Sequence, residues 1–233
     1  MDDEQQPDPV AAVRPAAREA LDREMRSIKD DVLRMGSLVE EAIRGAVDAL
    51  VRHDAEAAVA VIVGDARINE MQRRIAVQII ATIATQSPVA RDLRFLMALD
   101  RVANELERMG DHASSVAKQA RKLAPLPPLK RYVDLPEMGE RVAHQVHGIL
   151  LALVNLDADA ARSVAADDDE IDHIYRRTFD ELIDLMRADP DNVERGTRLL
   201  FAAYYTERIG DRVTNIAEDV VFLASGQSED LNP

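Results

Sequence analysis

Residues 107–112 read Glu-Arg-Met-Gly-Asp-His, and residues 207–212 read Glu-Arg-Ile-Gly-Asp-Arg, 100 positions later (207 − 107 = 100). A second pair of stretches, Asp-Ala-Arg-Ile-Asn over 65–69 and Asp-Asp-Glu-Ile-Asp over 168–172, stands 103 positions apart (168 − 65 = 103). The small difference between the two spacings fits insertions at turns and helix ends, where changes in length are tolerated. The sequence therefore predicts an internal duplication.

The composition favours helices with aliphatic cores. The chain has 9 Gly and 10 Pro among 233 residues, aromatic residues make up 3%, and there is no Trp. Ala, Leu, Val, Ile, Arg, Glu and Asp dominate, and these residues are common in long helices. A core without large rings must form where aliphatic side chains meet along helix seams, as in a helical bundle.

Apolar residues recur in alternating steps of three and four, which is the pattern of amphipathic helices. They predict one helix from about Pro15, a second over 55–86 and a third over 88–122, with Ser87-Pro88 as the N-cap and first turn of the third. After Pro136 the scheme repeats, with a helix that carries the apolar residues from Val142 to Leu156, another over 157–188 and a last helix opened by Asp189-Pro190. The main seam residues are Leu21, Met25, Ile28, Val32, Met35, Val39, Ala42, Ala46, Ala49, Ile68, Ile75, Ile79, Phe95, Leu99, Val102, Leu106, Met109, Ala113, Val116, Val142, Val146, Ile149, Leu153 and Leu156.

Three predicted helices thus match three others. The predicted fold class is all-α, with six long helices in two tandem, similar three-helix bundles. Pro125, Pro127 and Pro128 cannot continue a helix and predict a stiff connector between the bundles. The predicted organisation is a disordered tail over 1–13, a first repeat over 14–123, the Pro-rich connector over 124–135, a second repeat over 136–225 and a tail over 226–233.

The formal net charge of −14 argues against a nucleic-acid partner, because no stripe of Lys and Arg could replace phosphate counterions. Cations and basic protein surfaces suit the chain better. The acidic start lacks the apolar core of a signal peptide, and no apolar run approaches the roughly 18 residues needed to span a bilayer. A cytoplasmic location without direct membrane insertion is therefore expected. Because the chain has no Cys, any metal site must use oxygen or imidazole ligands.

A polar stripe runs along the predicted third helix, roughly 100° around the axis from the apolar seam and bordering the buried face. Arg101, Glu105 and Arg108 occupy the outward positions, where they are expected to pair with one another in solvent. The second helix and both corresponding helices of the other repeat carry matching acids and amides. Together the candidate metal ligands are Asp65, Asn69, Asp100, Asn104, Glu107, Asp111, Asp168, Asp172, Glu207, Asp211 and Asn215.

The spacing of these residues suits cation binding. An acid followed four positions later by an acid or amide places two oxygens on one helix face, about 5–6 Å apart. One such pair would indicate only a solvated face, but four pairs at equivalent places in two repeats indicate metal sites. Asp65 and Asp168 also align with apolar residues of their helices, where an uncompensated charge is unfavourable. Oxygen ligands predict hard ions, with iron or manganese favoured and magnesium, calcium or zinc as alternatives.

Gly110 and Gly210 each lie between a Glu and an Asp. Gly costs about 1 kcal/mol relative to Ala in a helix interior, so two reasons for both are expected: close approach by a neighbouring helix or ligand, or plain packing where two helices cross.

Two other functions stay open. A ferritin-like di-metal oxidoreductase or iron-binding protein would need two Glu-x-x-His pairs on bundle helices, and the chain offers Glu170-x-x-His173. A metal-free helical adaptor is the second alternative. No nucleophile elbow, zinc-protease signature or phosphate-cradling loop is visible, so the chain is not expected to be an enzyme.

Three stretches of the sequence together resemble the PhoU family: 92–97 (Asp-Leu-Arg-Phe-Leu-Met), 107–113 and its echo 206–218. The resemblance extends from about residue 16 to 225, including both copies of the signature and the proline-marked break. It implies a duplicated three-helix fold and multinuclear metal clusters held by Glu/Asp-x-x-x-Asp/Asn motifs, which fall on the candidate ligands named above. Asn69 departs from the pattern, because the other repeat has Asp172 there, so the two clusters are expected to differ.

The resemblance also implies a function. Proteins of this family regulate high-affinity phosphate transport, lowering uptake and repressing the phosphate-starvation response when phosphate is plentiful. The partners it implies are the ATPase subunit of the Pst phosphate ABC transporter and a phosphate-sensing histidine kinase. A homodimer is also expected.

Overall fold

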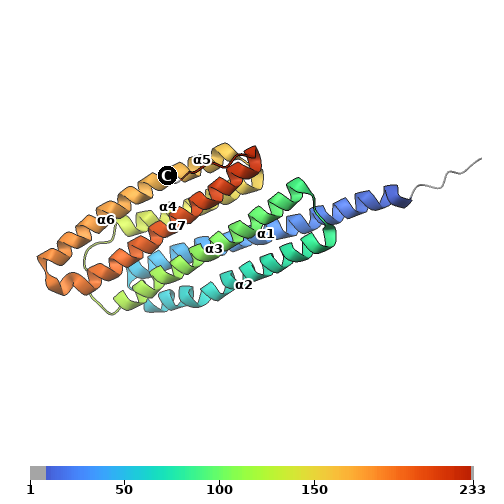
Figure 1. Ribbon diagram of the computed structural model, residues 1–233. Coiled ribbons are helices and arrows are strands. Elements are labelled where there is room, and N and C mark those ends of the chain that lie inside the picture. The colour runs from blue at the N-terminus through green and yellow to red at the C-terminus, as the bar shows by residue number, and fades with distance from the viewer. Residues whose placement is uncertain (1–8, 232–233) are drawn as a thin grey trace, which may run out of the picture.

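The computed structural model describes residues 9–231, with side chains from residue 18 onward, and all regular elements in that part of the chain are helices. The first repeat consists of α1 (Pro9–Arg52), α2 (Ala55–Gln86) and α3 (Ala90–Leu123). The second consists of α4 (Asp134–Asn155), α5 (Ala158–Ala166), α6 (Asp168–Ala188), the 3₁₀ turn η1 (Pro190–Asn192) and α7 (Val193–Ser225). The predicted all-helical class with two three-helix repeats is confirmed, and the repeats lie side by side (Figure 1).

The fifth predicted helix is interrupted where the second is continuous. It ends at Ala166 and restarts at Asp168 as α6, while α2 runs unbroken through Asp65. Residues 167–170 are four consecutive acids, and Asp favours helix ends over helix interiors because its side chain competes for backbone hydrogen bonds. Asp168 therefore lies in the first turn of a helix, where the helix dipole favours negative charge, and Asp65 does not.

Three predicted helix ends are wrong. α1 begins at Pro9 rather than near Pro15, so the predicted tail over 1–13 overlaps it, and residues 1–8 lie outside the described part of the chain. Ser87 is not the N-cap of α3: it ends α2 in the left-handed conformation (φ 46°), its N–H bonding to Ile83 O, and α3 starts at Ala90. Leu156 is the left-handed C-cap of α4 (φ 52°) rather than a seam residue within that helix. Asp189 does cap the following turn, accepting a hydrogen bond from Asp191 N.

The predicted seams form one continuous core. Along α1, Ile28, Val32 and Met35 are fully buried, and along α4 so are Met138, Val142 and Val146. Met25, Ala42 and Phe95 are the exceptions within the seams, since they are only partly buried against the core. α1 contacts α4 as well as α2 and α3, and α3 packs along α7, so the core spans both repeats.

A pseudo-twofold relationship governs the contact between the repeats. Gly36 and Val47 of α1 correspond to Gly139 and Leu150 of α4, each 103 positions later (139 − 36 = 150 − 47 = 103). A Cβ on Gly36 would meet Leu150 of the other repeat, and a Cβ on Gly139 would meet Val47. The glycine of each repeat therefore packs against the equivalent aliphatic residue of the other repeat. This exchange of equivalent contacts is the signature of a self-complementary interface.

The contact between α3 and α7 has the same pseudo-twofold symmetry, but the two equivalent pairs of residues interact in different ways. His112 of α3 stacks on Tyr205 of α7 at 6.0 Å between ring centroids. The corresponding pair with helices exchanged, Arg212 of α7 and Glu105 of α3, is an ion pair at 3.6 Å. A ring stack and an ion pair thus occupy equivalent positions on the two sides of the pseudo-twofold axis.

Two side chains expected to point outward instead face α7. Arg101 bonds Asp219 at 2.6 Å, and Glu105 accepts a hydrogen bond from Asn215 Nδ2 at 3.3 Å besides pairing with Arg212. Arg108 contacts Glu105 of the same helix, 3.8 Å away, and its side chain is the most exposed of the three. The expected pairing within the helix is therefore present between Arg108 and Glu105, but the outward placement is wrong for Arg101 and Glu105, because the docking of the second repeat covers part of this face.

The segment between α3 and α4 is tied to both repeats. His53, in the turn after α1, bonds Leu123 O through Nδ1 and Tyr132 Oη through Nε2, each at 3.2 Å, and its ring stacks on Tyr132. Lys130 pairs with Glu181 of α6, and Arg195 of α7 donates to Pro127 O at 3.3 Å. Prolines stiffen the segment, and these bonds fix its course.

Over the described residues, none of the helices is both long enough and apolar enough to cross a membrane.

Candidate metal centres

The first acidic centre lies where α2 meets α3. Asp65 and Asn69 come from α2, and Glu107 and Asp111 come from α3. Asn69 Nδ2 donates to Asp65 Oδ2 at 3.3 Å, but Asp65 Oδ1 and Asn69 Oδ1 are buried without a hydrogen-bond donor among the described residues. Buried oxygens without donors are rare because each forfeits its bonds to water, so these two are free to accept a hydrogen bond or to bind a cation.

The carboxyl groups of the first centre share one electrostatic environment. Burial raises the pKa of Asp65, and the nearby Asp111 carboxylate raises it further. Burial likewise raises the pKa of Glu107, with further contributions from Asp111 and Asp65. Asp65 and Glu107, which lie beside Asp111 and Asn69, therefore ionise less readily than isolated carboxyl groups, and a nearby cation would favour their ionisation.

The second acidic centre lies where α6 meets α7 and holds four carboxylates. Asp168 and Asp172 come from α6, and Glu207 and Asp211 come from α7. Burial raises the pKa of Asp168 to about 6, with Asp211 and Asp172 adding to the effect. Burial raises the pKa of Glu207 to about 7, again with Asp211 contributing. Glu207 Oε2 is buried without a donor in the described chain.

Basic groups partly neutralise the second centre from outside. Arg176 bonds Asp172 at 2.8 Å, and Arg208 bonds Asp211 at 2.5 Å. The Arg176 side chain is 73% exposed, so water screens its charge and it can leave the pair at little cost. Asp168 and Glu207, the two acids with the largest pKa shifts, lie on the buried side of the cluster.

The two glycines explain how closely the helices approach. A Cβ on Gly210 would lie 2.4 Å from Asp168 Oδ1, and one on Gly110 would lie 3.0 Å from Ile68 and 3.4 Å from Asp65 Oδ1. The expected close approach is confirmed for both. In the second centre the glycine makes room for the carboxylate itself, whereas in the first it makes room mainly for an isoleucine.

Two predicted ligands are drawn into other contacts, and a third lies apart from the first centre. Asn104 is exposed, accepts a hydrogen bond from Gln72 Nε2 at 3.1 Å and donates to Asp100 O at 2.7 Å. Asn215 turns toward Glu105 at the contact between repeats. Asp100 precedes Glu107 by about two helical turns, roughly 10 Å along the axis. The centres as folded therefore rest on eight residues, namely Asp65, Asn69, Glu107, Asp111, Asp168, Asp172, Glu207 and Asp211.

The donor set of both centres fits a hard cation. It consists of carboxylate and amide oxygens, the ligands preferred by Mg²⁺, Mn²⁺, Ca²⁺ and iron, and three of the oxygens lack donors. Among the described side chains, no group of three or more Asp, Glu or His residues could hold an ion as it stands. Binding therefore requires the carboxylates to turn toward a common point, or further oxygen ligands.

The histidines contribute to neither centre. His144, His147 and His173 are exposed, and His147 contacts Glu40 of α1. His112 faces α7, where burial and the nearby Arg212 lower its pKa. Glu170, the partner of His173 in the Glu-x-x-His motif, is also exposed and lies 4.0 Å from Arg141. Nothing in this arrangement favours a ferritin-like centre.

Sequence reasoning missed one polar residue that the fold places beside the second centre. Gln145 of α4 is 3% exposed and lies against both Asp168 and Gly210. The signal was a lone amide between the apolar residues Val142 and Val146, which are both fully buried.

Fold and centres together define a helical protein of two three-helix repeats. Each repeat has an acidic centre between two of its helices, α2 and α3 in the first repeat and α6 and α7 in the second. The PhoU domain matches the chain twice, over residues 32–120 and 135–220. The chain belongs to the PhoU family.

Similar proteins match nearly the whole chain. A phosphate-specific transport system accessory protein PhoU homolog of Clostridium acetobutylicum is 35% identical, covering 92% of this chain and 99% of that protein. One from Aquifex aeolicus is 37% identical, covering 88% and 93%. The crystal structure of PhoU from Pseudomonas aeruginosa matches with a TM-score of 0.85 at 36% identity, covering 88% of this chain and 99% of that one. That of the phosphate transport system regulatory protein PhoU from Streptococcus pneumoniae gives 0.83 at 31% identity, covering 90% and 99%.

Proposed function

We propose that this protein is an accessory regulator of phosphate-specific transport that lowers phosphate uptake and represses the phosphate-starvation response when phosphate is plentiful. The observation that carries the proposal is the double match to the PhoU domain together with relatives matched over nearly their full length. Those relatives are described as accessory or regulatory proteins of phosphate transport. The protein would act in the cytoplasm by binding partners, not by catalysis.

The proposed partners are the ATPase subunit of the phosphate transporter and a phosphate-sensing histidine kinase. The net charge of −14 suits docking on basic protein surfaces, because complementary charge speeds association and selects partners. A homodimer stays a prediction. Since the α1–α4 and α3–α7 faces are already used between the repeats, a second copy would have to bind elsewhere.

Metal binding at the two acidic centres is the second part of the proposal. Buried oxygens without donors and carboxyl groups with raised pKa values support it, because a cation would satisfy the former and favour ionisation of the latter. Asp65, Asn69, Glu107 and Asp111 would hold one ion or cluster, and Asp168, Asp172, Glu207 and Asp211 the other. The bound cations would supply positive charge that fixes the α2–α3 and α6–α7 faces for partner binding.

A deletion strain tests the regulatory proposal. With the gene removed and no second copy present, phosphate uptake and starvation genes should stay active in phosphate-rich medium, and a plasmid copy should restore repression. Purified protein should also retain the transporter ATPase or the kinase on a column. Arg108→Glu should weaken that association, whereas the same reversal at Arg101 is unsuitable because it would break the bond to Asp219 within the protein. Normal repression in the deletion strain would overturn the proposal.

A further inference from the structure

Gln145 is the one buried amide that borders an acidic centre in the described part of the chain. It lies on α4, a helix that otherwise contributes only core residues near this point, and its Oε1 is buried with no hydrogen-bond donor. Its Nε2 donates to Val164 O of α5 at 3.4 Å, near the upper limit for a hydrogen bond. A buried amide oxygen without a donor is unfavourable, so a donor or a cation is expected to bind it.

That oxygen points into the second centre. The position that a Cβ on Gly210 would occupy lies 3.6 Å from Gln145 Oε1 and 2.4 Å from Asp168 Oδ1. Both oxygens therefore face the same space, opened by the missing side chain of Gly210. The Asp168 carboxyl group also interacts with the Gln145 side chain directly. Two helices, α4 and α6, thus direct oxygens toward one place beside α7.

The first repeat has no equivalent of this amide. Gly45 and Asp54 recur as Gly148 and Asp157, 103 positions later, so the same spacing places Ala42 at the position of Gln145. The correspondence also holds in three dimensions, because a Cβ on Gly45 would meet Val61 at 3.0 Å and one on Gly148 would meet Val164 at 3.0 Å.

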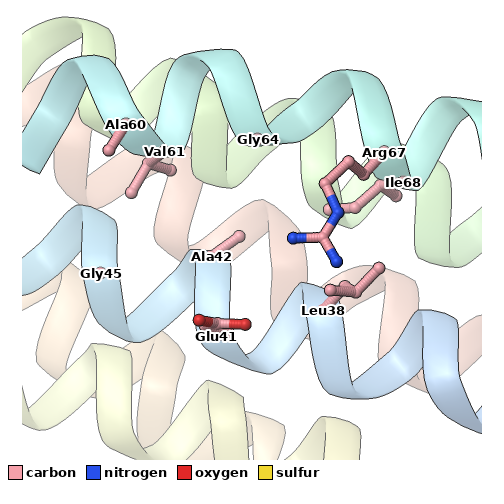
Figure 2. Close-up of a pocket in the computed structure, with 9 residues that line it drawn as sticks. All are labelled: Leu38, Glu41, Ala42, Gly45, Ala60, Val61, Gly64, Arg67 and Ile68. Carbon is pink, nitrogen blue, oxygen red and sulfur yellow. The ribbon is translucent and has the colours of Figure 1, made fainter.

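Around Ala42 the first repeat has a groove of about 240 Å³ between α1 and α2. Figure 2 shows its short lining side chains, with Arg67 reaching from α2 toward α1 beside Leu38 and Ala42. At the glycine itself, Ile68 and not an amide is nearest to the added Cβ of Gly110. The first centre is therefore closed by an apolar side chain where the second is open to Gln145.

We propose that Gln145 is a ligand of the second centre, contributing a neutral oxygen from α4 to a hard cation held by Asp168, Asp172, Glu207 and Asp211. This inference rests on the proposed metal binding and adds to it a difference between the repeats. The second centre has four carboxylates and an additional amide from a third helix, and the first has three carboxylates and Asn69. Because affinity for hard cations rises with the number and charge of oxygen ligands, the second centre should bind Mn²⁺ more tightly.

Manganese binding by variants made in an Asp111→Ala background, where the first centre is disabled, tests this assignment. Titration of Mn²⁺ followed by calorimetry and by the electron paramagnetic resonance of free Mn²⁺ should show remaining high-affinity binding in the background protein. Gln145→Met, which keeps the size but removes both amide atoms, should weaken that binding about tenfold or more. Gln145→Glu keeps an oxygen at the same place, so it should bind Mn²⁺ at least as tightly as the background.

Thr178→Val is the matched control, since Thr178 is also on the second repeat, is 1% exposed and has a hydroxyl without a partner in the described structure. It should leave Mn²⁺ affinity unchanged. The melting temperature without metal, measured for each variant, separates a packing effect from lost ligation. If Gln145→Met proves too unstable to titrate, Gln145→Glu decides alone.

The outcomes separate the two proposals. Absence of Mn²⁺ binding in the Asp111→Ala protein would overturn metal binding at the second centre, and this inference with it. Binding that persists unchanged in Gln145→Met would overturn only the role of Gln145. Weaker binding in Gln145→Glu than in the background would mean that the amide acts by donating to Asp168, which also contradicts ligation by its oxygen.

Discussion

Leu150 Cδ1 lies 2.0 Å from the position that a Cβ of residue 36 would occupy, so Gly36 is the only residue type that fits the α1–α4 crossing without repacking. Gly36→Ala should destabilise the protein by about 1–3 kcal/mol, the usual cost of overpacking a core. Urea unfolding would measure it. Combining it with Leu150→Ala, which removes the obstructing carbon, should cost less than the sum of the two single changes.

Gly64→Ala is the matched control for that substitution. Gly64 is inside α2, and a Cβ there would meet nothing within 4 Å. The change should therefore stabilise the protein by up to about 1 kcal/mol, because Ala is the better helix former. Destabilisation by Gly64→Ala would show that α2 is constrained by something beyond these contacts.

Gly210→Ala should disturb the second centre more than Gly110→Ala disturbs the first. The added Cβ would overlap the Asp168 carboxylate in one case and press on the flexible Ile68 side chain in the other. Metal content after dialysis, measured by elemental analysis, should fall in Gly210→Ala and change little in Gly110→Ala. Equal retention in both would argue against Asp168 as a ligand.

Removing one acid from each repeat should empty mainly one centre. Asp111→Ala should reduce the metal content assigned to the first centre and Asp211→Ala that assigned to the second. Chelation of the wild-type protein should lower its melting temperature, because the cation binds only the folded state and relieves repulsion between acids one turn apart. Full metal content in both variants would show that the ligand assignment is wrong.

The stability of the metal-free protein should fall as the pH rises from about 4 to about 7. Folded-state pKa values of about 6 for Asp168 and about 7 for Glu207 exceed those of unfolded carboxyl groups, near 4. The native state therefore binds more protons over this range, and its advantage is present at low pH and lost as the pH passes through the raised values. Glu207→Gln should flatten the decline in urea unfolding, and saturating Mn²⁺ should reverse it. A flat profile in chelator would contradict both shifts.

The bond between Arg101 and Asp219 should contribute modestly to the docking of the repeats. The Arg101 side chain is 47% exposed and that of Asp219 is 18% exposed, so solvent screens part of the attraction. A double-mutant cycle with Arg101→Ala and Asp219→Ala should give a coupling of about 0.2–1 kcal/mol. The exposed pair Arg187 and Asp184 on α6 provides a comparison within one helix, where a smaller coupling is expected.

Most of the fold follows from the sequence because the apolar residues keep the helical period over long stretches. The same regularity located the acids, since a spacing of four fixes two oxygens on one face whatever surrounds them. What the pattern could not provide is which helix covers which face. Arg101 and Glu105 look solvated on a single helix, and only the pseudo-twofold docking of α7 turns them into contacts between repeats.

Two local features escaped prediction for other reasons. Ser87 carries the side chain of a typical N-cap, but its left-handed backbone ends α2 and leaves α3 to start at Ala90. Gln145 carries no spacing signal, because its partner Asp168 lies on a helix that the sequence does not align with α4. Comparing the repeats position by position would have found it, since one has Ala42 where the other has a buried amide.

The bonds of His53, Glu181 and Arg195 to the segment between α3 and α4 have a mechanical consequence. A linker that is anchored to both halves opposes a hinge motion, and so does the shared α1–α4 and α3–α7 packing between the halves. A regulator built in this way would transmit a signal by the charge and order of its surface more readily than by a change in the angle between its halves. Ions arriving at the acidic centres would alter the charge directly while the scaffold stays still.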